Sequence, residues 1–351
     1  MTSANTDSPA NIKPPAGTDE VRNLVDRARK GDPRSVARLI SLVENGAPQL
    51  REVTAALAPH TGQAYLVGLT GAPGVGKSTT TNALVGWFRA QGRRIGVLAV
   101  DPSSPFSGGA LLGDRVRMQE HATDPEVFIR SMASRGHLGG LSAATPQALR
   151  VLDGAGCEVV LVETVGVGQS EIEIASAADT TVVLLAPGMG DGIQAAKAGI
   201  LEIGDVYVVN KADRDGADAT VRELHHMLAL GARRGPGDWR PPIVKTVAAD
   251  GTGLGDFAEA LAKHRSWLTE TGQLEVRRKA RIATEIEAVA LGSLRARFNA
   301  YRHQGGAQPG GAGAQSDEGG RLQELADEVY RGLLDPFAAA DELLDSFSFK
   351  A

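Results

Sequence analysis

The stretch "AYLVGLTGAPGVGKSTTTNALVGWFRAQG", residues 64–92, decides the fold of this chain. A short apolar run leads into the glycine-rich turn "GAPGVGKS", and a helix-forming segment follows the turn directly. The turn fits the pattern G-x-x-x-x-G-K-[ST], in which glycines let several backbone N–H groups point at one anion. In this pattern the lysine, Lys77, reaches the β- and γ-phosphates of a nucleotide, and the hydroxyl of Ser78 ligates Mg²⁺. The expected nucleotide contacts of the loop are Gly71, Ala72, Pro73, Gly74, Val75, Gly76, Lys77, Ser78 and Thr79.

Six more short apolar runs follow this stretch, and helical segments separate most of them. Several runs are continuous rather than alternating, as expected for strands that are covered on both faces. Alternating strands and helices predict an α/β fold with a mainly parallel sheet, in which ligands lie at the carboxyl ends of the strands. The runs are "RRIGVLAVD" (93–101), "EVFIRSM" (126–132), "CEVVLVET" (157–164), "TTVVLLAP" (180–187), "DVYVVNKAD" (205–213) and "PIVKTVAA" (242–249).

Helical extensions flank this central region at both ends. Residues 1–18 have the composition of a disordered tail, and residues 19–59 are expected to form an N-terminal helical arm. The nucleotide-binding domain is expected to span 60–271, and a C-terminal helical arm 272–351. A glycine-rich segment at 304–320 within that second arm is expected to be a flexible linker.

The C-terminal arm carries an apolar stripe on a highly charged helix. Such a stripe needs a partner surface, so we expect a homodimer held largely by the C-terminal helices. Packing of the stripe on its own nucleotide-binding domain is the alternative. The stripe consists of Ile282, Ile286, Val289, Leu294, Phe298 and Tyr301.

The sequence "VNKAD" places Asn210, Lys211 and Asp213 just past an apolar strand. Guanine presents two adjacent donors that the Asp213 carboxylate can accept, whereas adenine has an unprotonated nitrogen at that position. Asn210 would brace the loop, and the alkyl stem of Lys211 can cover the flat ring. A site built to hydrogen-bond its ligand rejects an analogue without those groups by roughly 10⁴-fold, so GTP and GDP are the expected nucleotides. The backbone N–H of Ala248, in "TVAAD", is a further candidate contact to the base.

Three carboxylates at strand ends or in the following loops are candidates for a Mg²⁺ site. Mg²⁺ takes octahedral oxygen ligands and usually keeps waters, so carboxylates often act through those waters. Asp101 ends an apolar run, and Asp114 follows in the Pro-, Ser- and Gly-rich loop; their alternative roles are a turn cap and a helix cap. Glu163 ends another run, and its extra methylene lets it reach a metal-bound water rather than the ion itself.

The sequence "ETVGV", 163–167, stands where many nucleotide switches carry Asp-x-x-Gly. Gly166 can offer a backbone N–H to the γ-phosphate, but Val167 cannot orient an attacking water as a glutamine would. We therefore expect GTP hydrolysis that is slow alone and accelerated by a partner. Lys197, in the glycine-rich segment 187–199, is a candidate for the missing positive group, although that segment could be a plain strand-to-helix loop. The expected catalytic residues are Lys77, Glu163, Gly166 and Lys197.

Composition and charge exclude several classes of protein. A formal net charge of −5 gives no general attraction to nucleic acid or anionic membranes. The single cysteine, Cys157, cannot form an internal disulfide, which fits a reducing compartment. No apolar run approaches the ~20 residues of a membrane span, and the first residues resemble neither a secretion signal nor a mitochondrial presequence. We therefore expect a cytoplasmic protein with no nucleic-acid or membrane partner.

Several segments together resemble one family, the MeaB-type G proteins. These are the GTPase chaperones of adenosylcobalamin-dependent methylmalonyl-CoA mutase, and older labels call the family a transport-associated ArgK-like kinase. The resemblance covers about residues 20–300, and the Glu-Thr-Val-Gly sequence in place of Asp-x-x-Gly is itself typical of the family. The segments that carry it are "GAPGVGKSTTTNAL", "VLAVDPSSPFSGGALLGDR", "ETVGVGQSE", "PGMGDGIQAAKAGILEIGD" and "VNKAD".

This resemblance implies a homodimer with helical arms at both ends. Such a protein uses GTP hydrolysis to gate cofactor loading into the mutase and to protect the mutase from inactivation. The resemblance also implies that Asp101, Asp114 and Glu163 lie around Mg²⁺, and that 187–199 is a third switch that senses the mutase. The glycine-rich insert at 304–320 departs from the family pattern.

Three other functions remain open on the sequence. A GTPase that serves as metallochaperone for another metalloenzyme, such as a nickel enzyme, would call for Cys or His pairs at metal spacing; the one such pair is His225-His226, on a predicted helix. An ArgK-like kinase would need a second substrate motif, and Asp213 argues against ATP. A nucleotide-gated scaffold that hydrolyses nothing useful is also compatible with the sequence.

Overall fold

The computed structural model describes the larger part of the chain. The described residues are 19–101, 119–121, 123–133, 144–164, 170–188, 202–230, 235, 237–304 and 320–346. The chain divides into two compact units, Met1–Arg281 and Ile282–Ala351. The expected disordered tail, 1–18, and almost all of the expected linker, 304–320, lie outside the described residues.

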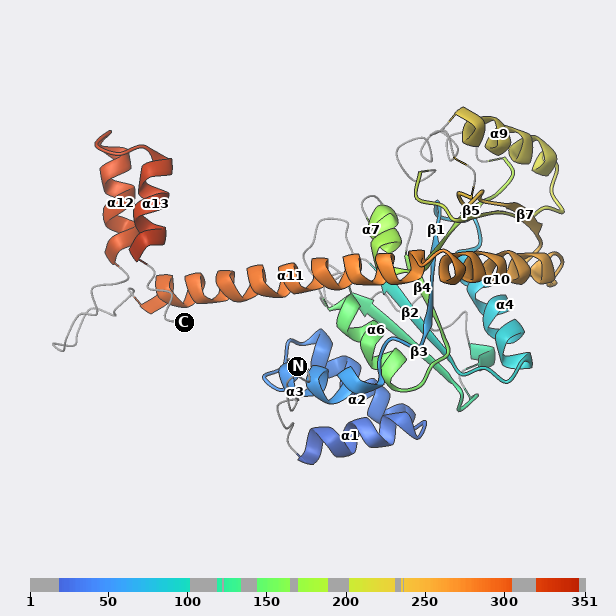
Figure 1. Ribbon diagram of the computed structural model, residues 1–351, viewed down its shortest axis with the longest axis horizontal. Coiled ribbons are helices and arrows are strands. Elements are labelled where there is room, and N and C mark those ends of the chain that lie inside the picture. Colours follow the sequence, from blue (N-terminus) through green and yellow to red (C-terminus); the bar gives the residue numbers. More distant parts are fainter. Residues whose placement is uncertain are drawn as a thin grey trace, which may run out of the picture. The chain divides into compact units, whose positions relative to one another are not determined.

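One seven-stranded sheet forms the centre of the first unit, in the order β3-β2-β4-β1-β5-β6-β7 (Figure 1). All neighbouring strands pair in parallel, and each of the seven apolar runs corresponds to one strand, which confirms the expected α/β fold. Glu163 of β4 lies level with Leu69 of β1 on one side and Ala99 of β2 on the other. The strands are β1 (Tyr65–Thr70), β2 (Ile95–Asp101), β3 (Val127–Ala133), β4 (Val159–Thr164), β5 (Thr180–Leu185), β6 (Val206–Asn210) and β7 (Ile243–Thr246).

Helices precede, connect and follow these strands. Within the described part of the chain, no helix has both the length and the apolar character needed to cross a membrane. The α-helices are α1 (Asp19–Arg29), α2 (Pro33–Glu44), α3 (Leu50–Leu57), α4 (Lys77–Ala90), α6 (Thr145–Gly154), α7 (Ser170–Ala177), α9 (Ala217–Leu230), α10 (Leu254–Glu270), α11 (Gln273–Gln304), α12 (Gly320–Tyr330) and α13 (Pro336–Ser346). Two short 3₁₀ turns, η1 (Ala58–His60) and η2 (Gln119–His121), complete the described helical elements.

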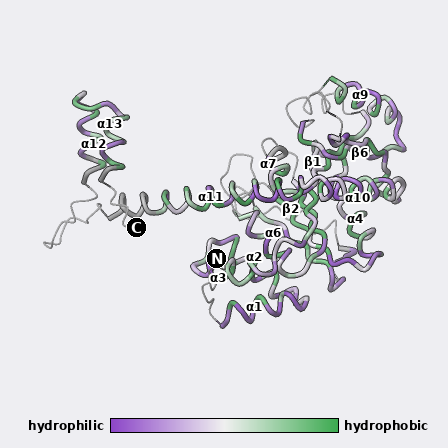
Figure 2. Tube along the Cα trace, in the orientation of Figure 1, coloured by the Kyte–Doolittle hydropathy of each residue, from purple (hydrophilic) through white to green (hydrophobic). Residues whose placement is uncertain are grey.

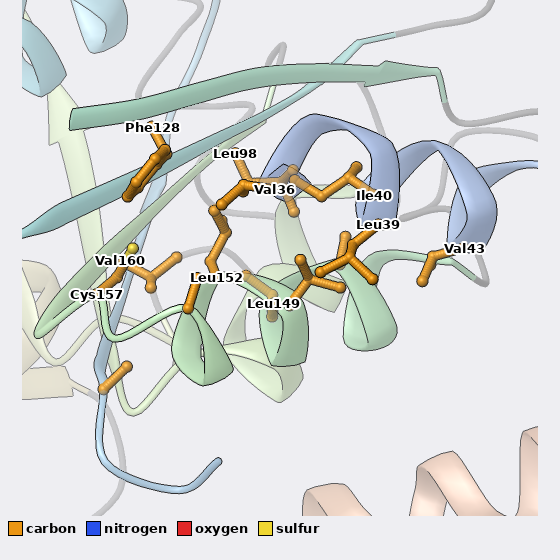
Figure 3. Close-up of a cluster of buried hydrophobic side chains, with 14 of the residues drawn as sticks. Val36, Leu39, Ile40, Val43, Leu98, Phe128, Leu149, Leu152, Cys157 and Val160 are labelled. Carbon is orange, nitrogen blue, oxygen red and sulfur yellow. The ribbon is translucent and has the colours of Figure 1, made fainter. Parts of the chain in front are cut away.

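Apolar side chains bury both faces of the sheet. On one face, α1, α2, α3, α6 and α7 contribute to a single cluster with β2, β3 and β4. On the other face, α4 and α10 pack over a second cluster that reaches from β3 to β6. Burial on both faces is why these strands read as continuous apolar runs. Figure 3 shows part of the first cluster, with Val36, Leu39, Ile40, Val43, Leu98, Phe128, Leu149, Leu152, Cys157 and Val160 labelled.

The N-terminal helices belong to this core. Along α1, hydrophobic and hydrophilic residues alternate (Figure 2), and Val21, Val25 and Ala28 are buried at helical spacing. Asp32 caps α2, because its carboxylate accepts a hydrogen bond from the backbone N–H of Arg34 at 3.2 Å. These helices therefore pack as part of the first unit.

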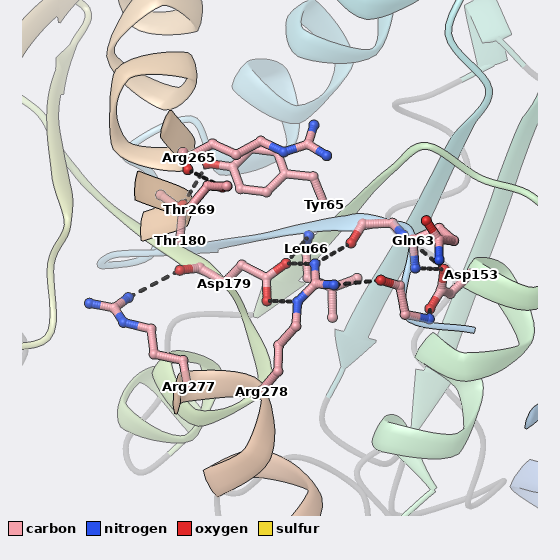
Figure 4. Close-up of polar contacts among 12 residues, drawn as sticks. Gln63, Tyr65, Leu66, Asp153, Asp179, Thr180, Arg265, Thr269, Arg277 and Arg278 are labelled. Carbon is pink, nitrogen blue, oxygen red and sulfur yellow. Dashed lines mark hydrogen bonds and ion pairs between the residues drawn. The ribbon is translucent and has the colours of Figure 1, made fainter. Parts of the chain in front are cut away.

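An ionic network holds the start of α11 at the amino ends of β5 and β6. Figure 4 shows the part of this network around Asp179. Asp179 is fully buried and accepts from Arg278 at 2.7 and 3.1 Å and from Arg281 at 3.2 Å. Arg277 binds both carboxylate oxygens of Asp205 at 2.9 Å. Paired bidentate contacts of this kind are the stronger class of ion pair, so they fix the first turns of α11 on the sheet.

A buried histidine lies beside this network. His264 is fully buried, and its Nδ1 lies 2.7 Å from the hydroxyl of Thr180, which in turn lies 2.5 Å from the hydroxyl of Tyr65. Burial lowers the pKa of His264 to about 4, with the nearby Asp205 opposing that shift. The imidazole is therefore neutral at pH 7, and its 3.4 Å contact with Asp205 is not an ion pair.

We expect Asp179→Ala to lower the free energy of unfolding of the first unit by about 3 kcal/mol, because it leaves two arginines without their buried partner. Glu259→Ala is the matched control, since its pair with Lys263 is exposed and such pairs contribute about 0–1 kcal/mol. Urea unfolding of both variants measures the difference. Equal losses in the two variants would contradict the role given to Asp179.

The second unit contains a short helical hairpin. Leu325 of α12 packs against Ala339 and Leu343 of α13. Asp335 caps α13 by accepting hydrogen bonds from the backbone N–H groups of Phe337 at 2.8 Å and Ala338 at 3.2 Å. The Asp-Pro pair at the start of α13 therefore begins a new helix.

Candidate functional site

The glycine-rich turn connects β1 to α4 at the carboxyl edge of the sheet. Gly71 has φ 142°, and a side chain there would come within 2.3 Å of the carbonyl oxygen of Leu184 on β5. Gly76 has φ 96°, and a side chain there would come within 2.4 Å of the amide nitrogen of Asn210 on β6. The loop therefore lies so close to β5 and β6 that only glycine fits at these two positions.

The lysine of the turn points back into its own loop. Lys77 is the first residue of α4 and is only 7% exposed. Its Nζ donates to the carbonyl oxygens of Gly71 at 2.7 Å and Ala72 at 3.1 Å. A buried ammonium group thus lies inside the loop at the N-terminus of a helix, where the backbone dipole also favours an anion.

Two hydroxyl groups of α4 hold the carboxylate of Glu163. The hydroxyl of Ser78 donates to Oε1 at 2.5 Å, and the hydroxyl of Thr81 donates to Oε2 at 2.7 Å. Glu163 is 4% exposed, and these donors satisfy a charge that would otherwise be costly to bury. Strand β4 positions the carboxylate, because it lies next to β1 and so directs its last residues at the start of α4.

These residues fit a Mg²⁺ ion by their chemistry. The Ser78 hydroxyl and the Glu163 carboxylate are hard oxygen ligands, and they lie together at the first turn of α4. Asp101 is the last residue of β2, level with Ala133 of β3, and its side chain lies outside the described part. Asp114, Gly166 and Lys197 also lie outside the described residues, so their expected roles remain predictions. Among the described residues, no group of three or more His, Cys, Asp or Glu side chains could hold a metal by itself.

The loop after β6 is tied to the phosphate loop by two side chains. Asn210 is 2% exposed, and its Nδ2 donates to the carbonyl oxygen of Val75 at 2.9 Å. Lys211 has φ 57°, an uncommon conformation for a residue other than glycine, and its Nζ donates to the carbonyl oxygen of Gly74 at 2.6 Å. Asp213, two residues further on, is exposed. Asn210 and Lys211 therefore join the loop after β6 to the phosphate loop.

The segment after β7 completes the support of Asn210. The amide oxygen of Asn210 accepts from the backbone N–H of Ala248 at 3.0 Å and from the hydroxyl of Thr246 at 3.2 Å. Ala248 was expected to offer its N–H to a base, but here that N–H braces the asparagine. Its direct contact with a base stays a prediction.

Two residues of this site were not anticipated from the sequence. Thr81 and Thr246 each contact a site residue through a hydroxyl group. The position of Thr81 contains a usable signal, because it lies four residues after Lys77 and three after Ser78 on one helix face. Thr246 has no comparable signal, since its contact depends on how β7 pairs with β6.

Comparison with protein families gives a match over most of the chain. Residues 36–303 match the family described as "Methylmalonyl Co-A mutase-associated GTPase MeaB". The match includes every described residue of the phosphate loop and of the Asn210 loop.

Curated relatives and one solved structure agree with that match. A protein of Pyrococcus abyssi is 46% identical over 325 residues, which cover 92% of this chain and 96% of that protein. GTPase ArgK of Escherichia coli is 36% identical, over 72% of this chain and 78% of its own length. The mouse protein named "Methylmalonic aciduria type A homolog, mitochondrial" is 35% identical, over 75% of this chain and 68% of its own length. A crystal structure described as an LAO/AO transport system kinase superposes with a TM-score of 0.64 at 25% identity, over 94% of this chain and 98% of that one.

Proposed function

Because this chain belongs to the MeaB family of methylmalonyl-CoA mutase-associated GTPases, we propose that it is a GTP-hydrolysing chaperone of an adenosylcobalamin-dependent methylmalonyl-CoA mutase. In this proposal, GTP hydrolysis gates the loading of cofactor into the mutase and protects the mutase from inactivation. The observation that carries the proposal is the family match over 36–303, which spans the joined phosphate and base loops.

The two joined loops would hold the guanine nucleotide. The backbone N–H groups of the glycine-rich turn and the ammonium group of Lys77 bind the phosphates. The Asp213 carboxylate accepts the two donors of guanine, and the stem of Lys211 covers the ring. Asn210 supports nucleotide binding without contacting the base, because it joins the loop that recognises the base to the loop that binds the phosphates.

Ser78 and Glu163 would hold a Mg²⁺ ion. When bound there, the ion supplies charge neutralisation at the β- and γ-phosphates. Ser78 offers its hydroxyl oxygen from the first turn of α4, and Glu163 offers a carboxylate oxygen from the end of β4. Asp101 and Asp114 are the further carboxylates proposed for this ion.

Hydrolysis is proposed to be slow without a partner. Glu163 is engaged by two hydroxyl groups of α4, which makes it a weak candidate for orienting an attacking water. Val167 stands where a water-orienting glutamine often lies, and the phosphate loop contains no arginine. In other GTPases a supplied positive group is worth roughly 10³–10⁵ in rate, and Lys197 in the 187–199 segment is the proposed source here.

The chain is proposed to act as a homodimer. Exposed apolar residues on α11 support this, since a highly charged helix with an uncovered apolar stripe calls for a partner surface. Light scattering of the full-length chain measures the oligomeric state. The exposed apolar residues of the described part of α11 are Val276, Ile282, Ile286, Val289, Leu291 and Leu294.

Nucleotide-dependent binding tests the proposed partner. The chain, loaded with GDP or with a non-hydrolysable GTP analogue, is mixed with purified methylmalonyl-CoA mutase from the same host, and complex formation is measured by calorimetry. We expect binding whose affinity differs between the two nucleotides, because a gate must distinguish them. Absence of binding in both states would contradict the proposal.

A transport-associated kinase is the second candidate, because the superposed crystal structure is described as an LAO/AO transport system kinase. A kinase transfers the γ-phosphate to a protein, whereas a GTPase releases it to water. Radiolabelled γ-phosphate that appears as inorganic phosphate, with no labelled protein, distinguishes the two functions.

A further inference from the structure

We infer that Thr81 is a positioning residue for Mg²⁺ binding, which acts by fixing the carboxylate of Glu163. This inference rests on the proposed function, because it concerns the Mg²⁺ ion that accompanies GTP. Thr81 itself is not placed on the ion or on the nucleotide.

The position of Thr81 explains how it reaches Glu163. It lies on α4 one turn after Lys77 and Ser78, so all three side chains share the helix face turned to the end of β4. Thr81 is fully buried, and its hydroxyl lies 2.7 Å from Glu163 Oε2 and 3.0 Å from the carbonyl oxygen of Lys77. A hydroxyl has one proton to donate, and the carboxylate is both the closer and the stronger acceptor.

The two carboxylate oxygens of Glu163 consequently have different partners and different roles. The last torsion of a glutamate side chain is soft, so a carboxylate held at one oxygen only can swing about that contact. Thr81 holds Oε2, and this leaves Oε1 directed at Ser78, on the side of the proposed ion. Without the Thr81 hydroxyl, Glu163 loses one of the bonds that fix the orientation of its carboxylate.

The neighbouring threonine supplies a matched control. Thr80 is also fully buried, one residue away on the same helix, and within the described part of the chain its hydroxyl makes no hydrogen bond. Thr81→Val and Thr80→Val therefore make the same isosteric change, and only the first removes a contact to Glu163. Thr81→Ser keeps the hydroxyl and serves as the conservative variant.

The readout is the Mg²⁺ dependence of nucleotide affinity. GDP binding is followed by fluorescence of a labelled analogue while Mg²⁺ is titrated, and again in EDTA. We expect Thr81→Val to raise the Mg²⁺ concentration for the half-maximal effect by roughly tenfold or more, as loss of an outer partner of a metal ligand does. Affinity in EDTA should stay unchanged in Thr81→Val, and the full titration should stay near wild type in Thr80→Val and Thr81→Ser.

A second comparison separates positioning from a structural role. In a Glu163→Gln background, Thr81→Val should raise the half-maximal Mg²⁺ concentration by less than about twofold, because both changes act through one carboxylate. If circular dichroism shows that Thr81→Val is unfolded, the pair Thr81→Ala and Thr80→Ala carries the same comparison. The inference would be overturned if the Thr81 variant and its matched Thr80 variant gave superposable Mg²⁺ titrations. It would also be overturned if Thr81→Val had its full effect on the half-maximal Mg²⁺ concentration in the Glu163→Gln background. A wild-type chain that binds no guanine nucleotide would instead overturn the proposed function.

Discussion

Replacing Asp213 by Asn is expected to weaken GTP binding by roughly 10⁴-fold, because it places a donor opposite the donors of guanine. The same change should allow xanthosine triphosphate to bind, since xanthine presents an acceptor where guanine carries its exocyclic amine. Competition binding with GTP, ATP and xanthosine triphosphate measures both effects.

Asp215→Asn is the matched control for this experiment. Asp215 is exposed and lies two residues further along the same loop, so the variant changes net charge equally without touching the proposed base contact. Its GTP affinity should equal that of the wild type. Equal affinity of the wild-type chain for ATP and GTP would show that Asp213 does not select the base.

Replacing Lys77 by Ala is expected to abolish tight nucleotide binding, with a loss of roughly 10²–10³-fold in affinity for GTP and GDP alike. Truncating one partner of a buried, hydrogen-bonded charge pair costs a few kcal/mol, and the phosphates would lose such a partner. The buried position of Lys77 within the loop is the structural reason.

Calorimetric titration of GDP measures this loss, and Lys263→Ala provides the control. Lys263 is an exposed lysine of α10, and its side chain is 67% exposed. Thermal unfolding of both variants verifies that they are folded. Matching GDP affinities in the two variants would contradict the phosphate-binding role of the loop.

The strands and the phosphate loop could be predicted from the sequence because their signals are local. A strand buried on both faces appears as one continuous apolar run, as in β4 and β5, and the glycine-rich turn is defined by consecutive residues. Helix caps are equally local, because the carboxylates of Asp32 and Asp335 accept hydrogen bonds from backbone N–H groups within the next three residues.

The contacts that bind these elements together could not be predicted in this way. The bond between Thr81 and Glu163 joins residues 82 positions apart, and the bond between Arg278 Nε and Asp179 joins residues 99 apart. Both depend on strand order, which places β4 beside β1 and β5 beside β6. The spacing of Thr81 from Lys77 and Ser78 places it on their helix face, but neither this threonine nor an arginine on a charged helix has a sequence signal that identifies its distant partner.

The loop that contains Asn210 could be predicted from the sequence only in part. Its sequence predicts a base-reading loop, but the sequence does not reveal that Asn210 accepts the N–H of Ala248 or that Lys211 donates to Gly74. These bonds join three separate loops into one support, and they form only because β6 pairs with β7 and lies near the turn after β1.

Single-turnover GTP hydrolysis, measured with and without methylmalonyl-CoA mutase from the same host, tests the central claim most directly. We expect slow hydrolysis by the chain alone and a clear rise when the mutase is added. Lys197→Ala should remove most of that rise while leaving GTP affinity nearly intact. A fast basal rate that the mutase does not change would contradict the account of this chain as a partner-activated GTPase.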